Sequence, residues 1–350
     1  MVSQDEIRRV DVSGMYNLIR DFPAQASEAI EIGRGARIKL SLPKIRNIVI
    51  TGLGGSAIGG DVLRSYSAGQ IGIPILVNRS YTLPQFVGGN SLVVVSSYSG
   101  STEETISAYA MARKKGAQIL VVSSGGEIGE IAAKSRHNWV KIPGGLPPRA
   151  ALGYSFFTML IVLQKVGLLK SQPAEIKEAL SLLKQLSKEY SDYQKDPLPL
   201  GLAEQLMDML PIVYSSTERF DAVNLRWRGQ MEENAKTVAY GNFFPEMNHN
   251  EIVGYATLRD LLSRFLVIYL LDEGDHPRVA ARFDFVKEII RPYCSNVVEI
   301  HSRGKSLLAR IFSLINLGDW TSYYLAIKKN VDPTPVGNID TLKKNLSELK

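Results

Sequence analysis

The sequence lacks a second cysteine, a long apolar segment and a secretory signal, and each absence excludes a class of protein. Cys294 is the single cysteine, so an internal disulfide and a thiolate metal cluster are excluded, as is usual in a reducing cytoplasm. Apolar runs such as 265–271 are far shorter than the ~20 residues of a membrane span. Residues 1–5 show no signal-peptide pattern. We therefore expect a cytoplasmic protein with no membrane partner.

Tracts of one charge sign are also missing, although basic residues are in excess. Lys and Arg number 41 and Asp and Glu 35, which gives a formal net charge of +6. The two signs alternate along the chain, so nucleic acid is disfavoured as a partner and a small anionic substrate fits as well. The 350 residues exceed the ~100–200 residues of a typical domain, which favours two domains.

The histidines are too dispersed for a metal site. His137, His249, His276 and His301 lie in separate segments, without ligand-like spacing such as H-x-x-x-H. We predict that the protein uses neither a metal ion nor any other cofactor. His137 and His301 each adjoin an expected strand, and we interpret both as structural.

Residues 46–145 alternate short β-branched runs with helical patterns. Strands are expected at NIVIT, IPILVN, SLVVVSS, QILVVSS and NWVKI. Because these strands are almost entirely apolar, they predict a parallel sheet covered by helices on both faces. An apolar helix is expected at 154–169.

The second half of the chain repeats this plan. Strands are expected at LPIVYSS, RFLVIYLLD and VVEIH, and helices follow them. Paired serines end one strand in each half, which suggests an old duplication. We predict an α/β fold of two doubly wound, three-layer domains with a C-terminal helical arm. The predicted boundaries are 1–165 for the first domain, 166–199 for a helical linker, 200–331 for the second domain and 332–350 for the arm.

A glycine-rich turn, TGLGGSAIGGD at 51–61, follows the first strand and opens a helix. Backbone N–H groups and the helix dipole bind anions at such a place. The run also matches the G-x-G-x-x-A form of the dinucleotide fingerprint. The next strand ends without an Asp or Glu to hold a ribose hydroxyl, although Arg79 would suit a 2′-phosphate. Phosphate binding, NADP binding and simple close packing of helix on strand all remain open.

A serine cluster, SSYSGSTEET at 96–105, places hydroxyls between the end of a strand and the start of a helix. Ligands of open α/β sheets bind at that edge. A capping box from Ser101 to Glu104 would explain only two of these residues. It leaves Ser97, Ser99 and Thr102, whose hydroxyls can donate to phosphate oxygens beside a helix N-terminus. The cluster therefore favours a phosphate site.

Acid–base candidates gather in RWRGQMEENAK at 226–236 and in the PEMNHNEIVGY that follows. Isomerisation of a phosphoaldose needs a base, a group that opens the ring and a donor for the enediolate. Glu232 and Glu233 could equally form a solvated helix face that pairs with neighbouring cations. His249 could be a turn histidine bonded to backbone. The residues alone leave these alternatives open.

The glycine turn and the serine cluster together resemble the sugar isomerase (SIS) domain family, in which such loops hold the phosphate of a phosphosugar. The resemblance implies two SIS-type domains. It also implies a set of phosphate-binding residues, namely Gly54, Gly55, Ser56, Ser97, Ser99 and Thr102.

Further strings extend the resemblance to nearly the whole chain. QMEENAKT, PEMNHNEIVG, LPPRAALGYS and LGDWTSYYLA are similar to segments of the bifunctional phosphoglucose/phosphomannose isomerases. The resemblance implies that Glu233 moves the C2 proton and that Arg149 is the cation near the enediolate. It implies a homodimer in which His249 assists ring opening and reaches the partner subunit's site. The family's C-terminal lysine is Lys343 or Lys344, and the I-x-x-L pattern favours Lys343.

The expected function is metal-independent interconversion of glucose 6-phosphate and mannose 6-phosphate with fructose 6-phosphate. The two aldoses differ only at C2, so a single cis-enediolate serves both. A non-catalytic phosphosugar sensor is the main alternative, although no effector domain is visible. An NADP-dependent oxidoreductase comes third. An aminosugar isomerase would require an ammonia-handling partner, which the sequence does not show.

Overall fold

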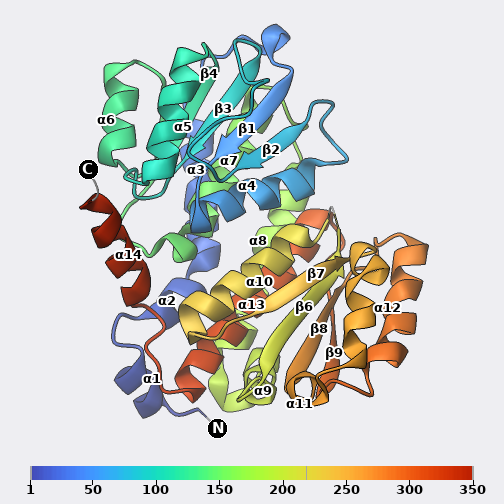
Figure 1. The fold of residues 1–350 in the computed structure, drawn as a ribbon. Helices are drawn as coiled ribbons and strands as arrows, with labels where there is room; N and C mark the ends of the chain where they lie inside the picture. Colours follow the sequence, from blue (N-terminus) through green and yellow to red (C-terminus); the bar gives the residue numbers. More distant parts are fainter. Residues whose placement is uncertain (1, 218, 349–350) are drawn as a thin grey trace.

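Two parallel β-sheets form the framework of the protein. The computed structural model describes residues 2–217 and 219–348, and Figure 1 shows one sheet in each half of the molecule. The first sheet contains β1 (Asn47–Thr51), β2 (Ile75–Asn78), β3 (Ser91–Ser96), β4 (Gln118–Ser123) and β5 (Asn138–Lys141). The second contains β6 (Leu210–Ser216), β7 (Tyr240–Phe244), β8 (Phe265–Leu271) and β9 (Asn296–His301).

The two sheets have the same strand order. The first runs β2-β1-β3-β4-β5 and the second β7-β6-β8-β9, and every strand pair is parallel. In each sheet the first strand therefore lies between the second and the third. This is the doubly wound arrangement, whose ligands bind where successive crossovers leave the sheet in opposite directions. The predicted fold class is confirmed, including the repeated plan.

Helices cover both faces of each sheet (Figure 1). The layer between the sheets consists of α3 (Phe22–Gly35), α4 (Gly54–Ser67), α7 (Leu152–Lys165), α8 (Pro173–Ser191), α10 (Asp221–Ala235) and α13 (Leu307–Lys328). The outer layers consist of α5 (Glu103–Lys114) and α6 (Gly126–Lys134) on the first sheet and α12 (Pro277–Ile290) on the second. The other helices are α1 (Gln4–Val10), α2 (Met15–Arg20), α9 (Leu198–Gln205), α11 (Arg259–Leu262) and α14 (Gly337–Ser347), with short 3-10 turns η1 (Leu42–Lys44), η2 (Pro148–Ala151), η3 (Tyr193–Lys195), η4 (Glu246–His249) and η5 (Glu251–Ala256).

Alternation along the strands divides the core. Ile48 and Ile50 of β1 face the large cluster in the middle layer, whereas Val49 faces the smaller cluster under α5 and α6, as the two-residue period of a strand requires. The middle layer contains α13, whose burial extends over most of its length. There Gly318 lets Trp227 approach, because a Cβ at that glycine would lie 2.5 Å from the indole nitrogen.

Residues 173–191, which the sequence analysis placed in a helical linker, form the packed helix α8. It lies against α13 and α3, and its buried side chains include Leu183, Leu186 and Tyr190. The domain boundaries stay a prediction. The C-terminal arm contains α14, which buries none of its residues.

Several helices and one strand of the structure were not predicted from the sequence. Helices α1, α2 and α3 precede the first predicted strand, and α9 lies directly before β6. Strand β7 is an edge strand that contains Gly241 and Asn242, so it lacks the apolar signal of the central strands. Within residues 2–217 and 219–348, no helix combines the length and apolar character needed to cross a membrane.

Candidate active site

The glycine turn and the serine loop meet at the carboxyl edge of the first sheet. They follow β1 and β3, which are neighbours in the sheet. A Cβ at Gly52 would lie 2.5 Å from the carbonyl oxygen of Ser96, so the two loops require a glycine at this position. Ser56 Oγ accepts a hydrogen bond from the backbone N–H of Tyr98 at 2.9 Å. The structure thus brings the two predicted phosphate-binding loops into direct contact.

The helices that follow these loops begin without side-chain caps. The N-cap residues are Leu53 for α4 and Thr102 for α5, and neither makes a capping hydrogen bond through its side chain. The alternative capping box between Ser101 and Glu104 is therefore wrong. The first N–H groups of a helix seek acceptors and carry partial positive charge, so both N-termini suit an anion.

The serine loop orders its own hydroxyls. Ser97 is buried, and its Oγ accepts from the N–H of Gly100 at 3.2 Å and lies 3.3 Å from Thr102 Oγ1. Ser99 is exposed, and its Oγ accepts from the N–H of Ser101 at 3.3 Å. The loop has a defined shape before any ligand binds.

A close backbone approach brings η2 to the glycine turn. A Cβ at Gly55 would lie 2.4 Å from the carbonyl oxygen of Pro148, which only a glycine permits. The hydroxyl of Tyr98 accepts from the N–H of Leu146 at 3.0 Å and holds the segment before η2. Arg149, the second residue of η2, is thereby fixed beside the predicted phosphate loops.

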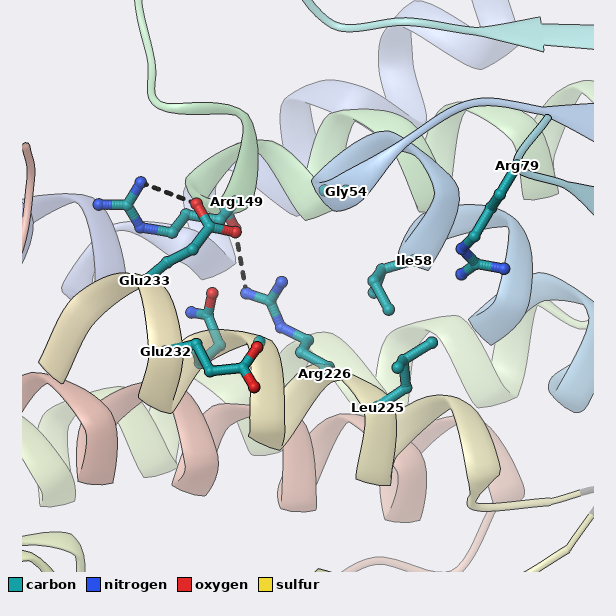
Figure 2. Close-up of a pocket in the computed structure, with 11 residues that line it drawn as sticks. Gly54, Ile58, Arg79, Arg149, Leu225, Arg226, Glu232 and Glu233 are labelled. Atoms are coloured by element: carbon teal, nitrogen blue, oxygen red, sulfur yellow. Dashed lines mark hydrogen bonds and ion pairs between the residues drawn. The ribbon is translucent and has the colours of Figure 1, made fainter. Parts of the chain in front are cut away.

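Arg149 joins three separate segments of the chain. Its Nη1 lies 3.2 Å from Glu233 Oε2, and its Nε donates to Asn234 Oδ1 at 2.7 Å. Its Nη2 donates to the carbonyl oxygens of Pro333 and Thr334 at 2.6 and 2.9 Å. Figure 2 shows the pair with Glu233 at the C-terminal end of α10. Burial lowers the pKa of Arg149, and Glu233 opposes that shift.

Lys236 attaches the same arm segment to α10. It is the left-handed C-cap of the helix, with φ of 50°. Its Nζ donates to the carbonyl oxygens of Asp332 and Pro333 at 2.6 and 3.0 Å and to that of Glu233 at 2.9 Å. Burial and the nearby Arg149 lower the pKa of Lys236 to about 8. Two cations therefore hold the start of the arm at the end of α10.

A cavity of about 230 Å³ opens between the two halves of the molecule. The glycine turn, η2 and one face of α10 surround it (Figure 2). Its lining residues are Gly54, Gly55, Ile58, Arg79, Arg149, Leu225, Arg226, Gly229, Gln230, Glu232 and Glu233. The cavity combines a predicted phosphate loop with the predicted base and cation.

Three charged residues that line this cavity were not among the predicted site residues. Arg79 pairs with Asp61 of α4, and Arg226 pairs with Asp319 of α13 at 2.7 Å. Glu232 is exposed, but partial desolvation raises its pKa. Helical spacing could have revealed Arg226, because it precedes Glu233 by two turns and residues so spaced share a helix face.

His249 and Lys343 lie outside this cavity. Helix α10 starts after β6 and runs back to the amino edge of the second sheet, where Glu233 lies, whereas η4 with His249 follows β7 at the carboxyl edge. His249 and Lys343 are both exposed. Lys343 belongs to α14, which extends toward the first sheet in Figure 1. A single chain therefore brings together Arg149 and Glu233 but not these two residues.

The donor groups of the described residues are also dispersed. Across 2–217 and 219–348, no three His, Cys, Asp or Glu side chains cluster closely enough to hold a metal ion. His137 Nδ1 lies 2.7 Å from the hydroxyl of Tyr109, in agreement with a structural role.

Comparison with known proteins identifies the class of this fold. Residues 198–346 match the family model described as the bacterial phospho-glucose isomerase C-terminal SIS domain. The C-terminal domain of glucosamine-fructose-6-phosphate aminotransferase from Francisella tularensis superposes with a TM-score of 0.66 at 15% identity, over 95% of this chain and 100% of that one. The protein has the SIS fold, with two doubly wound sheets.

Curated relatives narrow the class. The bifunctional phosphoglucose/phosphomannose isomerase of Caldicellulosiruptor bescii is 44% identical over 96% of this chain and 100% of its own length. The protein of the same name from Thermoplasma acidophilum is 37% identical over 86% of this chain and 90% of its own. The chain belongs to the bifunctional phosphoglucose/phosphomannose isomerase family and is an isomerase.

Proposed function

We propose that the protein interconverts glucose 6-phosphate and mannose 6-phosphate with fructose 6-phosphate through a cis-enediolate, without a metal ion. The observation that carries this proposal is the ion pair between Arg149 and Glu233, at 3.2 Å, in the cavity that the glycine turn also lines. A base and a cation lie together beside a predicted phosphate loop, as a phosphoaldose isomerase requires.

Glu233 acts as the base that transfers a proton between C1 and C2. Its side chain is 30% exposed, so it can meet a substrate in the cavity while its helix stays packed. The carboxylate takes the C2 proton of the aldose and returns it to C1, which yields the ketose. Return of the proton to C2 gives glucose or mannose 6-phosphate according to which face of C2 the bound enediolate turns toward Glu233, so one base serves both aldoses.

Arg149 stabilises the enediolate formed between these steps. Its side chain is 3% exposed, and a cation in such a low-dielectric site interacts strongly with developing negative charge. Its bonds to Asn234, Pro333 and Thr334 fix the guanidinium before substrate arrives. Preorganisation of this kind lowers the reorganisation needed in the reaction.

The phosphate binds at the two loops on the carboxyl edge of the first sheet. Ser56, Ser97, Ser99 and Thr102 supply hydroxyls, and Gly54 and Gly55 permit close approach of the backbone. The support for this site is the contact between the loops and the uncapped starts of α4 and α5. Each helix start adds about half a positive charge.

His249 and Lys343, the remaining two predicted site residues, can reach the cavity only from a second subunit or through a different position of the C-terminal arm. We propose that His249 assists ring opening in the partner subunit's site of a homodimer. Its exposure and its distance from the Glu233 end of α10 support that assignment. Lys343 would enter the site by a movement of α14. The segment that precedes this helix is held at Pro333 by hydrogen bonds from Arg149 and Lys236.

The test is to incubate the purified protein with fructose 6-phosphate and a strong chelator, without nucleotide, and to follow both aldose phosphates by proton NMR. Formation of both supports the proposal. Formation of only one would overturn the dual specificity. Binding of fructose 6-phosphate without turnover would favour the non-catalytic sensor and overturn the enzymatic proposal.

A further inference from the structure

The three arginines of the cavity differ in the hydrogen bonds that they have left to offer. Arg79, Arg149 and Arg226 each pair with a carboxylate. A guanidinium carries five N–H donors. The donors that protein acceptors do not already engage are the ones that a substrate can meet.

Most N–H donors of Arg149 are already engaged by acceptors of the protein. Its Nε has one acceptor, its Nη2 has two, and its Nη1 has Glu233. Four of its five donors are therefore engaged by the protein. One N–H of Nη1 remains for a ligand.

Arg226 has one terminal nitrogen, Nη1, that can donate to a ligand in the cavity. Its Nε and Nη2 donate to the two carboxylate oxygens of Asp319 at 2.9 and 2.7 Å, and its Nη2 also donates to the carbonyl oxygen of Arg149 at 3.1 Å. Among residues 2–217 and 219–348, its Nη1 has no hydrogen-bond partner. In Figure 2 its guanidinium points from α10 toward the cavity, beneath Arg149.

The environment of Arg226 fixes its orientation. A two-bond pair with a carboxylate fits the planar fork of arginine and defines its plane. Asp319 is itself held by Gln230, whose Nε2 donates at 3.0 Å. Because Asp319 engages Nε and Nη2, the free Nη1 lies on the opposite edge of the guanidinium. A buried side chain, 3% exposed, thus presents two unengaged donors to the cavity.

We propose that Arg226 contacts the substrate directly and donates from Nη1 to an oxygen of the enediolate. This inference rests on the proposed isomerase function and adds a second cation to it. The bond from Nη2 to the carbonyl oxygen of Arg149 holds Arg226 against η2, and Arg149, Arg226 and Glu233 line the same cavity. The two arginines share the negative charge that develops at O1 and O2 of the sugar.

The experiment compares two phosphorylated ligands by calorimetry. A phosphorylated aldonate carries a carboxylate that resembles the enediolate, whereas a phosphorylated hexitol lacks that charge but keeps the phosphate. Arg226→Lys should weaken binding of the aldonate by about tenfold or more, since a charge-assisted hydrogen bond is lost. Binding of the hexitol should change far less. Equal weakening of both, or of neither, would overturn the proposal.

A double variant covers the case in which Arg226→Lys does not fold. Arg226→Met combined with Asp319→Leu removes both charges together and leaves no unpaired charge in the interior. It should show the same selective loss for the aldonate. An equal fold-change in affinity for the two ligands, measured against wild type, would again overturn the proposal.

The matched control is Arg64→Lys. Arg64 pairs with Asp221 between α4 and α10, so it also ties α10 to a neighbouring helix, but it does not line the cavity. Both affinities should stay at the wild-type level. Failure of the proposed function would appear differently, as a wild-type protein that produces neither aldose from fructose 6-phosphate.

Discussion

Arg149 Nη1 and Glu233 Oε2 lie 3.2 Å apart, although 84 positions separate the two residues in the chain. Arg149 belongs to the turn that rests on the first sheet's glycine loop, and Glu233 belongs to α10, which packs on the second sheet. The pair therefore exists only when both halves of the molecule are in place. Its consequences can be tested residue by residue.

Replacement of Arg149 by lysine should impair catalysis more than binding. Lysine keeps the charge but cannot reproduce the fork that bonds Asn234, Pro333 and Thr334. We expect kcat to fall by about 10²–10³, as for loss of a group that stabilises developing charge. Steady-state kinetics of Arg149→Lys and of Arg303→Lys, an arginine outside the cavity, would check this. An unchanged kcat for the first variant would contradict the role of Arg149.

Replacement of Ser97 by alanine should weaken phosphate binding. Its buried hydroxyl lies between Gly100 and Thr102, and we propose that it donates to the phosphate. We expect KM for fructose 6-phosphate to rise about tenfold, as for a lost hydrogen bond to a charged group. The nearby exposed Ser101→Ala is the control. Equal effects of the two substitutions would place the phosphate elsewhere.

Lys236 should contribute a pH dependence to stability. Burial lowers its pKa in the folded protein to about 8, below the ordinary value of 10.5. Between these pH values the unfolded chain binds more protons, so the contribution of this group to stability rises with pH. The cost of charging it is fully present below pH 8. The free energy of unfolding of Lys236→Met minus that of wild type should therefore be more positive at pH 7 than at pH 10.5.

Urea unfolding of wild type and Lys236→Met at the two pH values measures this difference. The substitution also removes hydrogen bonds to Asp332 and Pro333, so the absolute change can have either sign. Only its variation with pH reports the shifted pKa. A difference that does not vary with pH would contradict the assignment.

A methyl group at Gly55 should separate η2 from the glycine turn. The added Cβ would lie 2.4 Å from the carbonyl oxygen of Pro148, so the backbone must move. We expect Gly55→Ala to lose about 1–3 kcal/mol of stability, together with activity, because Arg149 moves with η2. Gly35→Ala is the control, since nothing lies within 4 Å of its Cβ. Thermal unfolding of both variants checks the contrast, and equal stabilities would contradict it.

The central strands could be predicted from the sequence because burial on both faces leaves a continuous apolar run. β3 is buried at every position, and its apolar run SLVVVS clearly predicted a strand. Edge strand β7 is mostly half-buried and gives no such signal. Helix α8 is amphipathic with a broad polar face, so its role in the packed middle layer depends on contacts with α13 that local sequence does not encode.

The candidate site could be predicted in part. Glycine and serine loops carry local signatures, and the resemblance pointed to Glu233 and Arg149, which the structure brings together. Helical spacing places Arg226 on the same face of α10 as Glu233, but its pairing with Asp319, 93 positions away, has no local signature. His249 lies at the opposite edge of its sheet from Glu233, so its predicted role requires a second subunit that one chain does not describe.

The central claim is that Glu233 transfers the proton, and Glu233→Gln tests it most directly. The variant would be incubated with fructose 6-phosphate in deuterium oxide and followed by NMR, with phosphorylated aldonate binding measured by calorimetry and the exposed Glu130→Gln as control. We predict that neither aldose forms and that no deuterium enters at C1, while the aldonate still binds. Formation of either aldose at the wild-type rate would contradict the account.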